Sequence, residues 1–421
     1  MKKQLVYLIV GLFVTLMCSA CNDYLKEGSI DWDNIDKDDE SIEFTLNHPC
    51  LLHTEADFDY VRSKVDAKAQ PWYDGWQKLV NNGYSKTTYT PSPVESLERG
   101  GLSNWGNSVR DGQAAYQHAL IWKISGNEDF AKSAINILNQ WAKTCKRIAG
   151  DGGGDILVAG FQGYQFANAA EIMRTYSGWK EEDFKAFQKW MLDVFYPVSY
   201  GFIANRTDPI GHGWLSWEVP SNLTVLSIGI LCDDKELINW ALNYFYKGGG
   251  PGSIQYMVVD MHEDPAGRVK GKNLAQSQEM GRDQGHAAIA IPILGAFCQS
   301  AYNIGVDLFG YDNNKILSLC EYFAKYNLNP DQAIEMPFTR YYTTKDGGKW
   351  HETISSVGRG ETRPGWELIY NHYVKMKGVE APYSTEFAEK VRPEGGMLDF
   401  VGGGRGDQLG FGTLMYTRGN D

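Results

Sequence analysis

Residues 279–302 read EMGRDQGHAAIAIPILGAFCQSAY. The first eight residues bring together a cation, two carboxylates, an amide and an imidazole, and the following residues are mostly small or apolar. An apolar run of this kind predicts a buried helix. The polar cluster then lies at the helix N-terminus, where free N–H groups and the helix dipole favour an anion. A simpler structural role is equally open, in which Asp283 caps the helix and Arg282 pairs with Glu279.

Segments with helical periodicity precede this stretch and follow one another closely. Links of only a few residues make neighbouring helices antiparallel. Few stretches show the period-two alternation of strands before about residue 335. We expect early helices from about residues 54 and 71, then helices over 111–124, 128–148, 156–176, 180–198, 221–231 and 235–247, a last helix over 366–375, and possible strands over 338–343 and 410–416.

Such hairpins can build an (α/α) toroid, a superhelical repeat array or an irregular bundle. A repeat array would show recurring residues at a fixed period of about 34–45 residues, and the sequence has no such repeat. We therefore predict an all-α fold, an (α/α) toroid of antiparallel helix hairpins with a few short strands near the C-terminus. Long glycine-rich loops over 150–155, 201–220 and 248–278 would line one end of its central cleft.

The N-terminus has the form of an export signal, with two lysines, an apolar run over 5–17 and Ser19-Ala20-Cys21. It resembles a bacterial lipoprotein signal with Cys21 as the lipidated residue; an ordinary secretory signal cut nearby is the alternative. We expect an exported protein, lipid-anchored at the outer membrane on its periplasmic or cell-surface face. The predicted organisation is a signal over 1–21, a flexible acidic tether over 22–41 and one toroid domain over 42–421.

The net charge of -12 argues against nucleic acid or an anionic membrane surface as the main partner. An acidic ligand remains compatible, because a basic pocket can lie within an acidic protein. The cysteines after the signal are odd in number and widely spaced, which predicts buried free thiols and no disulfide frame. No Cys/His spacing suggests zinc, and we expect no metal, no cofactor and a monomer. These cysteines are Cys50, Cys145, Cys232, Cys298 and Cys320.

Two loops carry candidate binding residues. Residues 205–222 contain His212, Trp217 and Asn222, and loop tryptophans beside polar groups suit a sugar ring, whose C–H faces stack on aromatic side chains. The tryptophans could instead close the top of the core. Residues 248–282 contain Tyr256 and several cations, either a port for an anionic polymer or a solvated basic face. The cations are Arg268, Lys270, Lys272 and Arg282.

These residue types suit β-elimination in a uronic acid polymer. The enzyme must neutralise the carboxylate beside C5 with donors such as Asn, His or Arg, so that the C5 proton can be removed. It then needs a His or Tyr base and a Tyr or His acid for the leaving glycosidic oxygen. Neither a metal nor a pair of carboxylates is required.

Three segments resemble those of Bacteroides-type lipoproteins in the alginate lyase superfamily: residues 48–54, 281–286 and 363–373. The resemblance implies an (α/α) toroid and cleavage of alginate or a related polyuronate. The better-known alginate lyases carry an Asn-His pair before a tryptophan, and here those types are spread over His212, Trp217 and Asn222. They also carry a tyrosine after an arginine, whereas here His286 follows Arg282.

We therefore expect a polysaccharide lyase acting on an acidic polysaccharide, with alginate first and glucuronan next. Arg282, His212 and Asn222 would neutralise the carboxylate, and His286 and Tyr256 would share the proton transfers. The expected substrate-binding residues are Asn107, Gln113, Trp217, Glu279, Gln284, Trp366, Asn371 and His372.

Two other functions stay open. One is a uronyl glycoside hydrolase on a similar toroid, which needs a carboxylic acid as proton donor; Glu279, Asp283 or Glu367 could serve. The other is a non-catalytic glycan-binding surface lipoprotein.

Overall fold

The computed structural model describes residues 41–400 and 406–419, and the chain from residue 41 onward packs as one compact unit. The predicted signal, the lipidation site Cys21 and the tether as far as residue 40 lie outside the described residues. Within the described part, no helix has both the length and the apolar character needed to cross a membrane.

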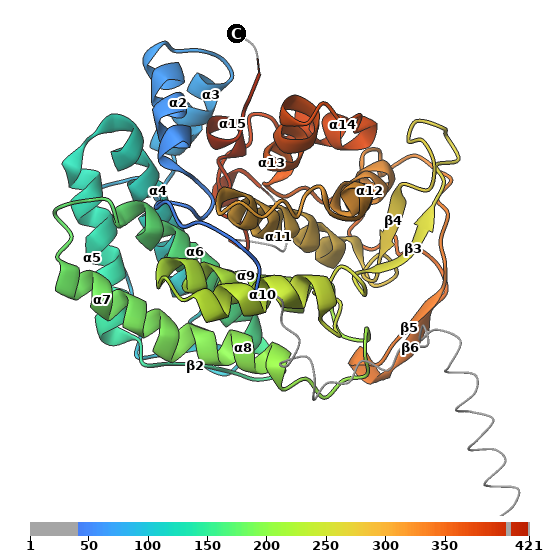
Figure 1. Cartoon of the computed structure of the whole chain (residues 1–421), viewed down its shortest axis with the longest axis horizontal. Coiled ribbons are helices and arrows are strands. Elements are labelled where there is room, and N and C mark those ends of the chain that lie inside the picture. Colours follow the sequence, from blue (N-terminus) through green and yellow to red (C-terminus); the bar gives the residue numbers. More distant parts are fainter. Residues whose placement is uncertain (1–40, 401–405, 420–421) are drawn as a thin grey trace, which may run out of the picture. The chain divides into compact units, whose positions relative to one another are not determined.

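Four long helices form an inner layer and are buried on nearly every side: α4 (Gly106–Ser125), α6 (Gly154–Met173), α9 (Leu215–Leu231) and α11 (Gln284–Asn303). The helix α6 packs between α4 and α9, and α9 packs in turn on α11 (Figure 1). Because these helices are covered all round, they have no polar stripe, and the polar side chains of α4, such as Asp111 and Gln117, are themselves buried and hydrogen-bonded. The buried helix predicted from residues 279–302 is confirmed, and Asp283 caps it.

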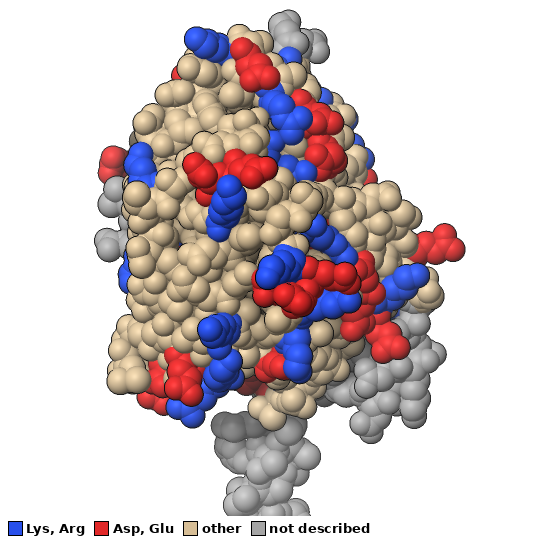
Figure 2. All heavy atoms as spheres, turned by 90° about the vertical axis from the view of Figure 1, so that its left-hand side faces the viewer, with Lys and Arg blue, Asp and Glu red and all other residues tan. Residues whose placement is uncertain are grey.

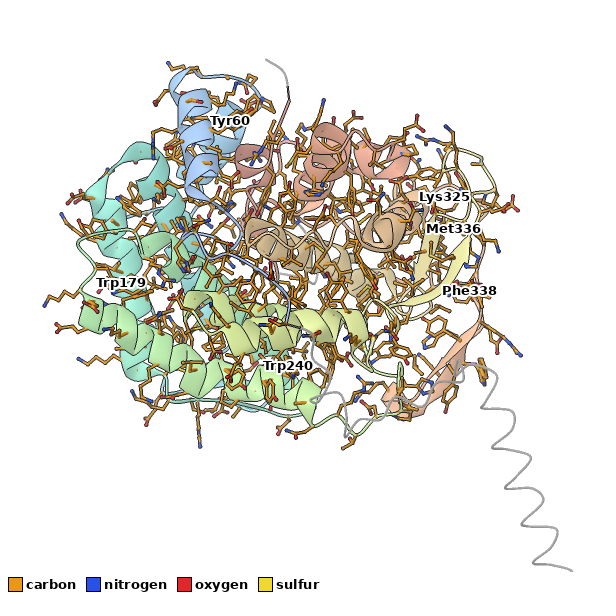
Figure 3. All side chains as sticks on the ribbon, in the orientation of Figure 1. Tyr60, Trp179, Trp240, Lys325, Met336 and Phe338 are labelled. Carbon is orange, nitrogen blue, oxygen red and sulfur yellow. The ribbon has the colours of Figure 1, made fainter. Side chains whose placement is uncertain are left out.

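An outer layer of helices covers the inner one: α5 (Glu128–Thr144), α7 (Glu181–Trp190), α8 (Tyr196–Ala204) and α10 (Lys235–Lys247). Three of them are amphipathic, whereas α8 is short and mostly apolar. Two tryptophans labelled in Figure 3 join these helices. Trp179 donates its indole N–H to Asn139 of α5 at 2.9 Å, and the Trp240 ring lies 4.6 Å from the Tyr200 ring of α8. Acidic and basic side chains are interspersed on the α5 and α7 side, as Figure 2 shows.

The remaining elements are short strands and further helices from both halves of the chain. The predicted all-α class is confirmed, but the short strands are spread along the chain rather than gathered near its end. They form three two-stranded sheets: β1 (Ser96–Arg99) with β2 (Arg147–Gly150), β3 (Val258–His262) with β4 (Leu274–Ser277), and β5 (Tyr341–Thr343) with β6 (Lys349–His351). The further helices are α2 (Glu55–Asp66), α3 (Trp72–Val80), α12 (Tyr311–Asn327), α13 (Trp366–Tyr370), α14 (Pro382–Val391) and α15 (Gly412–Met415).

Two local predictions are wrong. The expected strand over 410–416 is the short helix α15. The helix expected from residue 221 begins six residues earlier, at Leu215, so Trp217 lies in a first helical turn and not in a loop. The reason is Pro220, which lies inside α9. Proline is normally a helix boundary because it removes a backbone hydrogen bond, but here the burial of α9 outweighs that loss.

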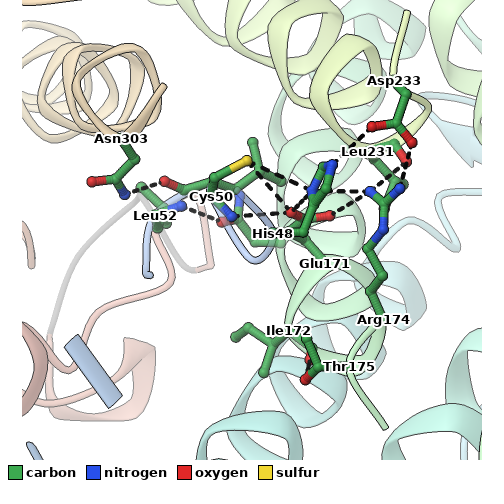
Figure 4. A network of polar contacts seen from close by, with 12 residues as sticks. His48, Cys50, Leu52, Glu171, Ile172, Arg174, Thr175, Leu231, Asp233 and Asn303 are labelled. Atoms are coloured by element: carbon green, nitrogen blue, oxygen red, sulfur yellow. Dashed lines mark hydrogen bonds and ion pairs between the residues drawn. The ribbon is translucent and has the colours of Figure 1, made fainter. Parts of the chain in front are cut away.

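A network of charged side chains joins the N-terminal segment to α6 and to the turn before α10 (Figure 4). Glu171 of α6 accepts hydrogen bonds from the Cys50 backbone N–H at 3.0 Å and from His48 Nδ1 at 2.5 Å. The other His48 nitrogen lies 2.8 Å from Asp233, and Arg174 pairs with both carboxylates. The network therefore links three segments that are distant in sequence.

The same network contains a His, a Cys and a Glu whose ligand atoms lie within 4.8 Å of one another. However, Arg174 Nη1 lies 3.0 Å from His48 Nδ1. A guanidinium this close repels a metal cation, so we interpret the group as an ion-pair network. The free thiols predicted for the five cysteines are confirmed, Cys50 among them.

His48 gives the folded protein a pH dependence. Burial alone lowers the pKa of its imidazole, but hydrogen bonds with Cys50 and Glu171 and the charge of Glu171 outweigh burial and raise the pKa to about 10. An imidazole in the unfolded chain titrates near pH 6.5. The folded state therefore binds more protons between these values, so the stabilisation is complete below about pH 6.5 and is lost as the pH rises towards 10.

We therefore expect the free energy of unfolding to fall between about pH 7 and pH 10. The fall should be less steep in His48→Gln, which has no imidazole to titrate. Denaturant unfolding at stepped pH values measures both slopes, and equal slopes for the two proteins would contradict this origin.

Candidate active site

A cavity of about 290 Å³ opens beside the N-terminal end of α11. All four inner helices begin next to it: Trp105 precedes α4, while α6, α9 and α11 contribute residues of their first two turns. Each helix directs the positive end of its dipole and unpaired N–H groups towards its start, so the cavity favours an anion. It is lined by Arg99, Trp105, Leu157, Phe161, Ser216, Trp217, Asp283, Gly285, His286, Ile289, Glu361, Arg363 and Asp407.

His286 is held on this wall by Asp283. The Asp283 carboxylate accepts the His286 backbone N–H at 2.8 Å and lies 2.6 Å from ring nitrogen Nδ1. Burial would raise the pKa of Asp283, but these two hydrogen bonds outweigh it and lower the pKa. An ionised Asp283 assigns the proton to Nδ1 and leaves Nε2 with its lone pair. The His286 side chain is 39% exposed, so it is open to a substrate.

Arg282 and Glu279 lie directly behind His286. Arg282 Nη1 donates to Glu279 at 3.1 Å, its Nε lies 3.9 Å from the Asp283 carboxylate, and its guanidinium stacks 4.2 Å from the Trp214 ring. Glu279 is fully buried and also accepts hydrogen bonds from the backbone and side chain of Ser216. The predicted pair of Arg282 and Glu279 therefore exists, and it connects the start of α9 to the start of α11.

Two further arginines belong to the cavity wall. Arg363 is bound between Glu361 at 2.7 Å and Asp407 at 2.9 Å, so its charge is already matched. Arg99 stacks 4.5 Å from the Trp105 ring, and within the described residues its guanidinium has no hydrogen bond or ion pair. Arg99 is thus the cation of the wall that remains available to a ligand carboxylate.

Trp217 packs so closely against Gly153 that no larger residue fits at that position. A Cβ atom at Gly153, the residue before α6, would lie 2.4 Å from the Trp217 ring. Gly285, between Asp283 and His286, is similarly close to Glu361, at 2.9 Å from an added Cβ. Because neither glycine has a side chain, Trp217 and Glu361 can pack closely against the backbone of the cavity wall.

The predicted site residues are only partly brought together. Trp217 and His286 line the cavity and Arg282 lies behind it. His212 and Tyr256 do not line it. The His212 ring instead lies 5.9 Å from the Tyr342 ring of β5, and Tyr256 packs against Gly211.

Three predicted polar residues belong to the core. Asn222 is 1% exposed and donates to the Ala241 carbonyl of α10, so it cannot neutralise a substrate carboxylate. Gln113 is buried and donates to the Gln408 carbonyl. Gln284 is buried and donates to the backbone around Ser355. Their amides satisfy buried backbone groups, which is the usual role of a polar side chain in a core.

Four other substrate-binding predictions are also corrected. Trp366 is buried against Phe387, Asn371 donates to the Glu367 carbonyl of its own helix, and His372 stacks on the Phe309 ring at 3.8 Å. Burial lowers the pKa of His372 to about 4. Asn107 donates to the Ser92 carbonyl and lies outside the cavity lining. Each side chain makes contacts that hold the fold.

The basic residues between 268 and 272 form a solvated face. Arg268 pairs with Glu386 at 2.5 Å and Lys270 lies 3.4 Å from Glu380, both on the exposed surface beside α14. Neither lines the cavity. The interpretation of this segment as a polymer port is therefore not supported.

Sequence reasoning missed Arg99, Trp105 and Asp407. Arg99 and Trp105 lie in the glycine-rich stretch before the first inner helix, and Asp407 lies about 120 residues after His286. Arg363 was also missed as a cavity residue, although it is the first residue of one of the three segments that resemble the family. Arg99, Trp105 and Asp407 are brought to the cavity only by the tertiary fold.

A sequence model of the family described as alginate lyase matches residues 59–333 of the chain. Among solved structures, a complex of alginate lyase A1-III with a tetrasaccharide has 15% sequence identity and a TM-score of 0.57, covering 89% of this chain and 100% of that chain. Alginate lyase A1-III from Sphingomonas species A1 gives 15% and 0.56 with the same coverage.

An alginate lyase from Bacteroides ovatus gives 12% identity and a TM-score of 0.54, covering 82% of this chain and 96% of that one. No protein of curated function matches. The predicted (α/α) toroid and the resemblance to alginate lyases are both confirmed.

Proposed function

The chain belongs to the alginate lyase family and is a polysaccharide lyase of uronate polymers, and we propose that it cleaves alginate at mannuronate residues, with His286 as both general base and general acid. The single observation that carries the proposal is the imidazole of His286, oriented by Asp283 on the wall of the cavity where four helices begin. Glucuronan is the next candidate substrate.

The first task of the site is to make the C5 proton acidic. Arg99 on the cavity wall and the helix N-termini would bind the C6 carboxylate of the sugar, and Arg282, which pairs with Glu279 outside the lining, would add positive charge from behind Asp283. Positive charge there stabilises the negative charge that spreads from C5 into the carboxylate in the transition state. Trp105 and Trp217 provide aromatic faces for the sugar ring.

His286 Nε2 then removes the C5 proton, while Asp283 stabilises the imidazolium that forms. The C5–H electron pair becomes the C4=C5 double bond, and the C4–O glycosidic bond breaks with its electrons on oxygen. The same imidazolium returns the proton to that oxygen, which releases the new chain end. Tyr256 does not line the cavity, so the proposal places both proton transfers on His286.

When one imidazole acts as both base and acid, the stereochemistry of the sugar decides whether it can be cleaved. In mannuronate and glucuronate the C5–H and C4–O bonds lie on the same face of the ring, whereas in guluronate they lie on opposite faces. One imidazole reaches both atoms only when they share a face. The proposed site therefore prefers mannuronate or glucuronate.

We expect polymannuronate to be cleaved at least about tenfold faster than polyguluronate at limiting substrate, a difference of about 1.4 kcal/mol in transition-state free energy. The ultraviolet absorbance of the C4=C5 bond measures the rates, with glucuronan and glycosaminoglycans tested in parallel. Equal rates on the two alginate blocks would contradict a single base and acid, and no absorbance on any polyuronate would overturn the proposed function.

The hydrolase alternative lacks a suitable acid among the nominated residues. Glu279 and Glu367 are fully buried, the first bonded to Ser216 and the second paired with Arg392 at 2.6 Å. Asp283 is kept ionised by His286. New reducing ends without ultraviolet absorbance would nevertheless restore that alternative.

A further inference from the structure

We propose that the exposed face of the β5–β6 hairpin binds the uronate chain beyond the cavity, as a remote sugar platform. The platform consists of Tyr342 and Trp350, with Arg340 beside them and Lys345 in the turn of the hairpin. The inference rests on the proposed function and extends it from one cavity to a longer binding surface.

The hairpin has one buried and one exposed face. On the buried face, Tyr341 stacks on His351 at 4.6 Å, and its hydroxyl accepts the Gly281 N–H at 3.0 Å, next to Arg282. On the opposite face, Tyr342 and Trp350 are directly paired across the strands and are 38% and 44% exposed. Their ring centroids lie 5.6 Å apart. The buried contacts therefore fix the exposed rings to the loop that carries the active site.

This pair is unusual for the protein. Of the large hydrophobic side chains exposed in the described chain, three are aromatic, and two of these three are neighbours on this hairpin. Exposing two adjacent rings costs free energy unless a partner covers them. Tyrosine and tryptophan are also the side chains best suited to the C–H face of a sugar, because each has a flat apolar body and a polar edge.

The turn of the hairpin connects the platform to the cavity. Lys345 lies 6.0 Å from the ring of Trp217, which lines the cavity, and pairs with Asp208 at 2.7 Å. Thr344 donates to the His212 carbonyl at 3.5 Å, and the His212 ring contacts Tyr342. The surface from Trp217 through the turn to Tyr342 is therefore continuous, which places the platform along a path that a polymer leaving the cavity can follow.

A cation beside the rings suits the same occupant. Arg340 lies 3.7 Å from Glu352 in an ion pair whose two side chains are both largely exposed, and Lys345 pairs with Asp208. An exposed pair such as Arg340–Glu352 is weak, so a ligand carboxylate can compete for the guanidinium. Arg340 stacks 5.0 Å from the Trp350 ring, so a cation lies beside the exposed aromatic surface. A chain of uronates offers both an apolar ring face and a carboxylate in each residue, which matches this combination.

The test compares substrate lengths. We expect the double variant Tyr342→Ala/Trp350→Ala to raise KM for long polymannuronate about tenfold, the loss that two aromatic contacts produce. The kcat on the polymer and both constants on a mannuronate tetrasaccharide should be unchanged. The double variant Tyr342→Phe/Trp350→Phe should keep most of the affinity, because it keeps the rings.

Tyr311→Ala is the matched control, since Tyr311 is 40% exposed on α12 and outside the platform and the cavity. It should leave KM unchanged on both substrates. The proposal is overturned if KM on the polymer changes less than about twofold, or if the tetrasaccharide suffers the same loss. A wild-type dimer that the alanine variant converts to monomer would also overturn it, by assigning the rings to a second copy. An inactive wild type would instead remove the proposed function itself.

Discussion

Replacing His286 with alanine is expected to lower kcat on the uronate polymer by at least about 10³-fold, because one imidazole both removes and returns the proton. The melting temperature should hardly change. The ring is partly exposed, its one described hydrogen bond is to Asp283, and the N-cap bond uses the His286 backbone N–H, which alanine keeps. Such a partly exposed side chain contributes at most about 0.5 kcal/mol to folding. The rate of ultraviolet absorbance and thermal unfolding measure the two effects.

Two further variants sharpen this test. Asp283→Asn keeps an N-cap but removes the charge that orients the imidazole, so we expect a smaller loss, on the order of 10²-fold. His262→Ala removes a histidine of β3 outside the cavity and should leave kcat unchanged. If His286→Ala instead kept its activity, or unfolded many degrees earlier than the wild type, the residue would be structural.

The largest loss of stability is expected from Glu171→Ala. The substitution leaves the Cys50 N–H and His48 Nδ1 without their buried acceptor, and only the half-exposed Asp233 remains to pair with His48 and Arg174. Removing one partner from a buried charged network costs about 3–5 kcal/mol when the remaining charges are unpaired, so with Asp233 in place we expect a loss of about 3 kcal/mol. Chemical denaturation of the folded protein at pH 7 measures the change.

Glu386→Ala is the control for that measurement. Its carboxylate pairs with Arg268 at 2.5 Å, but both side chains are about two-fifths exposed, at 44% and 40%. Surface ion pairs of this kind contribute about 0–1 kcal/mol. Similar losses for the two glutamates would show that the Glu171 network contributes no more than an exposed pair.

Local sequence patterns predicted where the helices lie, but they did not show that several polar residues are buried in the core. The helix from Gln284 was predictable because apolar residues, a capping aspartate and flanking polar residues all lie within a short window. Gln113 could not be placed in the same way, since its partner is the backbone of Gln408, 295 residues away. A buried amide with a distant partner has the same local sequence as an amide in a binding site.

The same limit applies to the site. His286 and Asp283 are three residues apart, so their pairing follows from the geometry of a helix start. Arg99 reaches the cavity only because β1 pairs with β2 beside the start of α6, a contact between segments about fifty residues apart. Trp217 was expected in a loop because Pro220 suggested a boundary, whereas it lies in the first turn of α9 and lines the cavity.

The two glycines in the cavity wall bear on how the specificity of this enzyme could be redesigned. Any side chain at position 153 would push the Trp217 ring away, and one at 285 would displace the Glu361 carboxylate. Leu157 and Ile289, by contrast, line the cavity with side chains that can be exchanged for smaller or larger ones. A mutant library that varies these two positions and keeps both glycines would explore new substrates while preserving the geometry that holds His286.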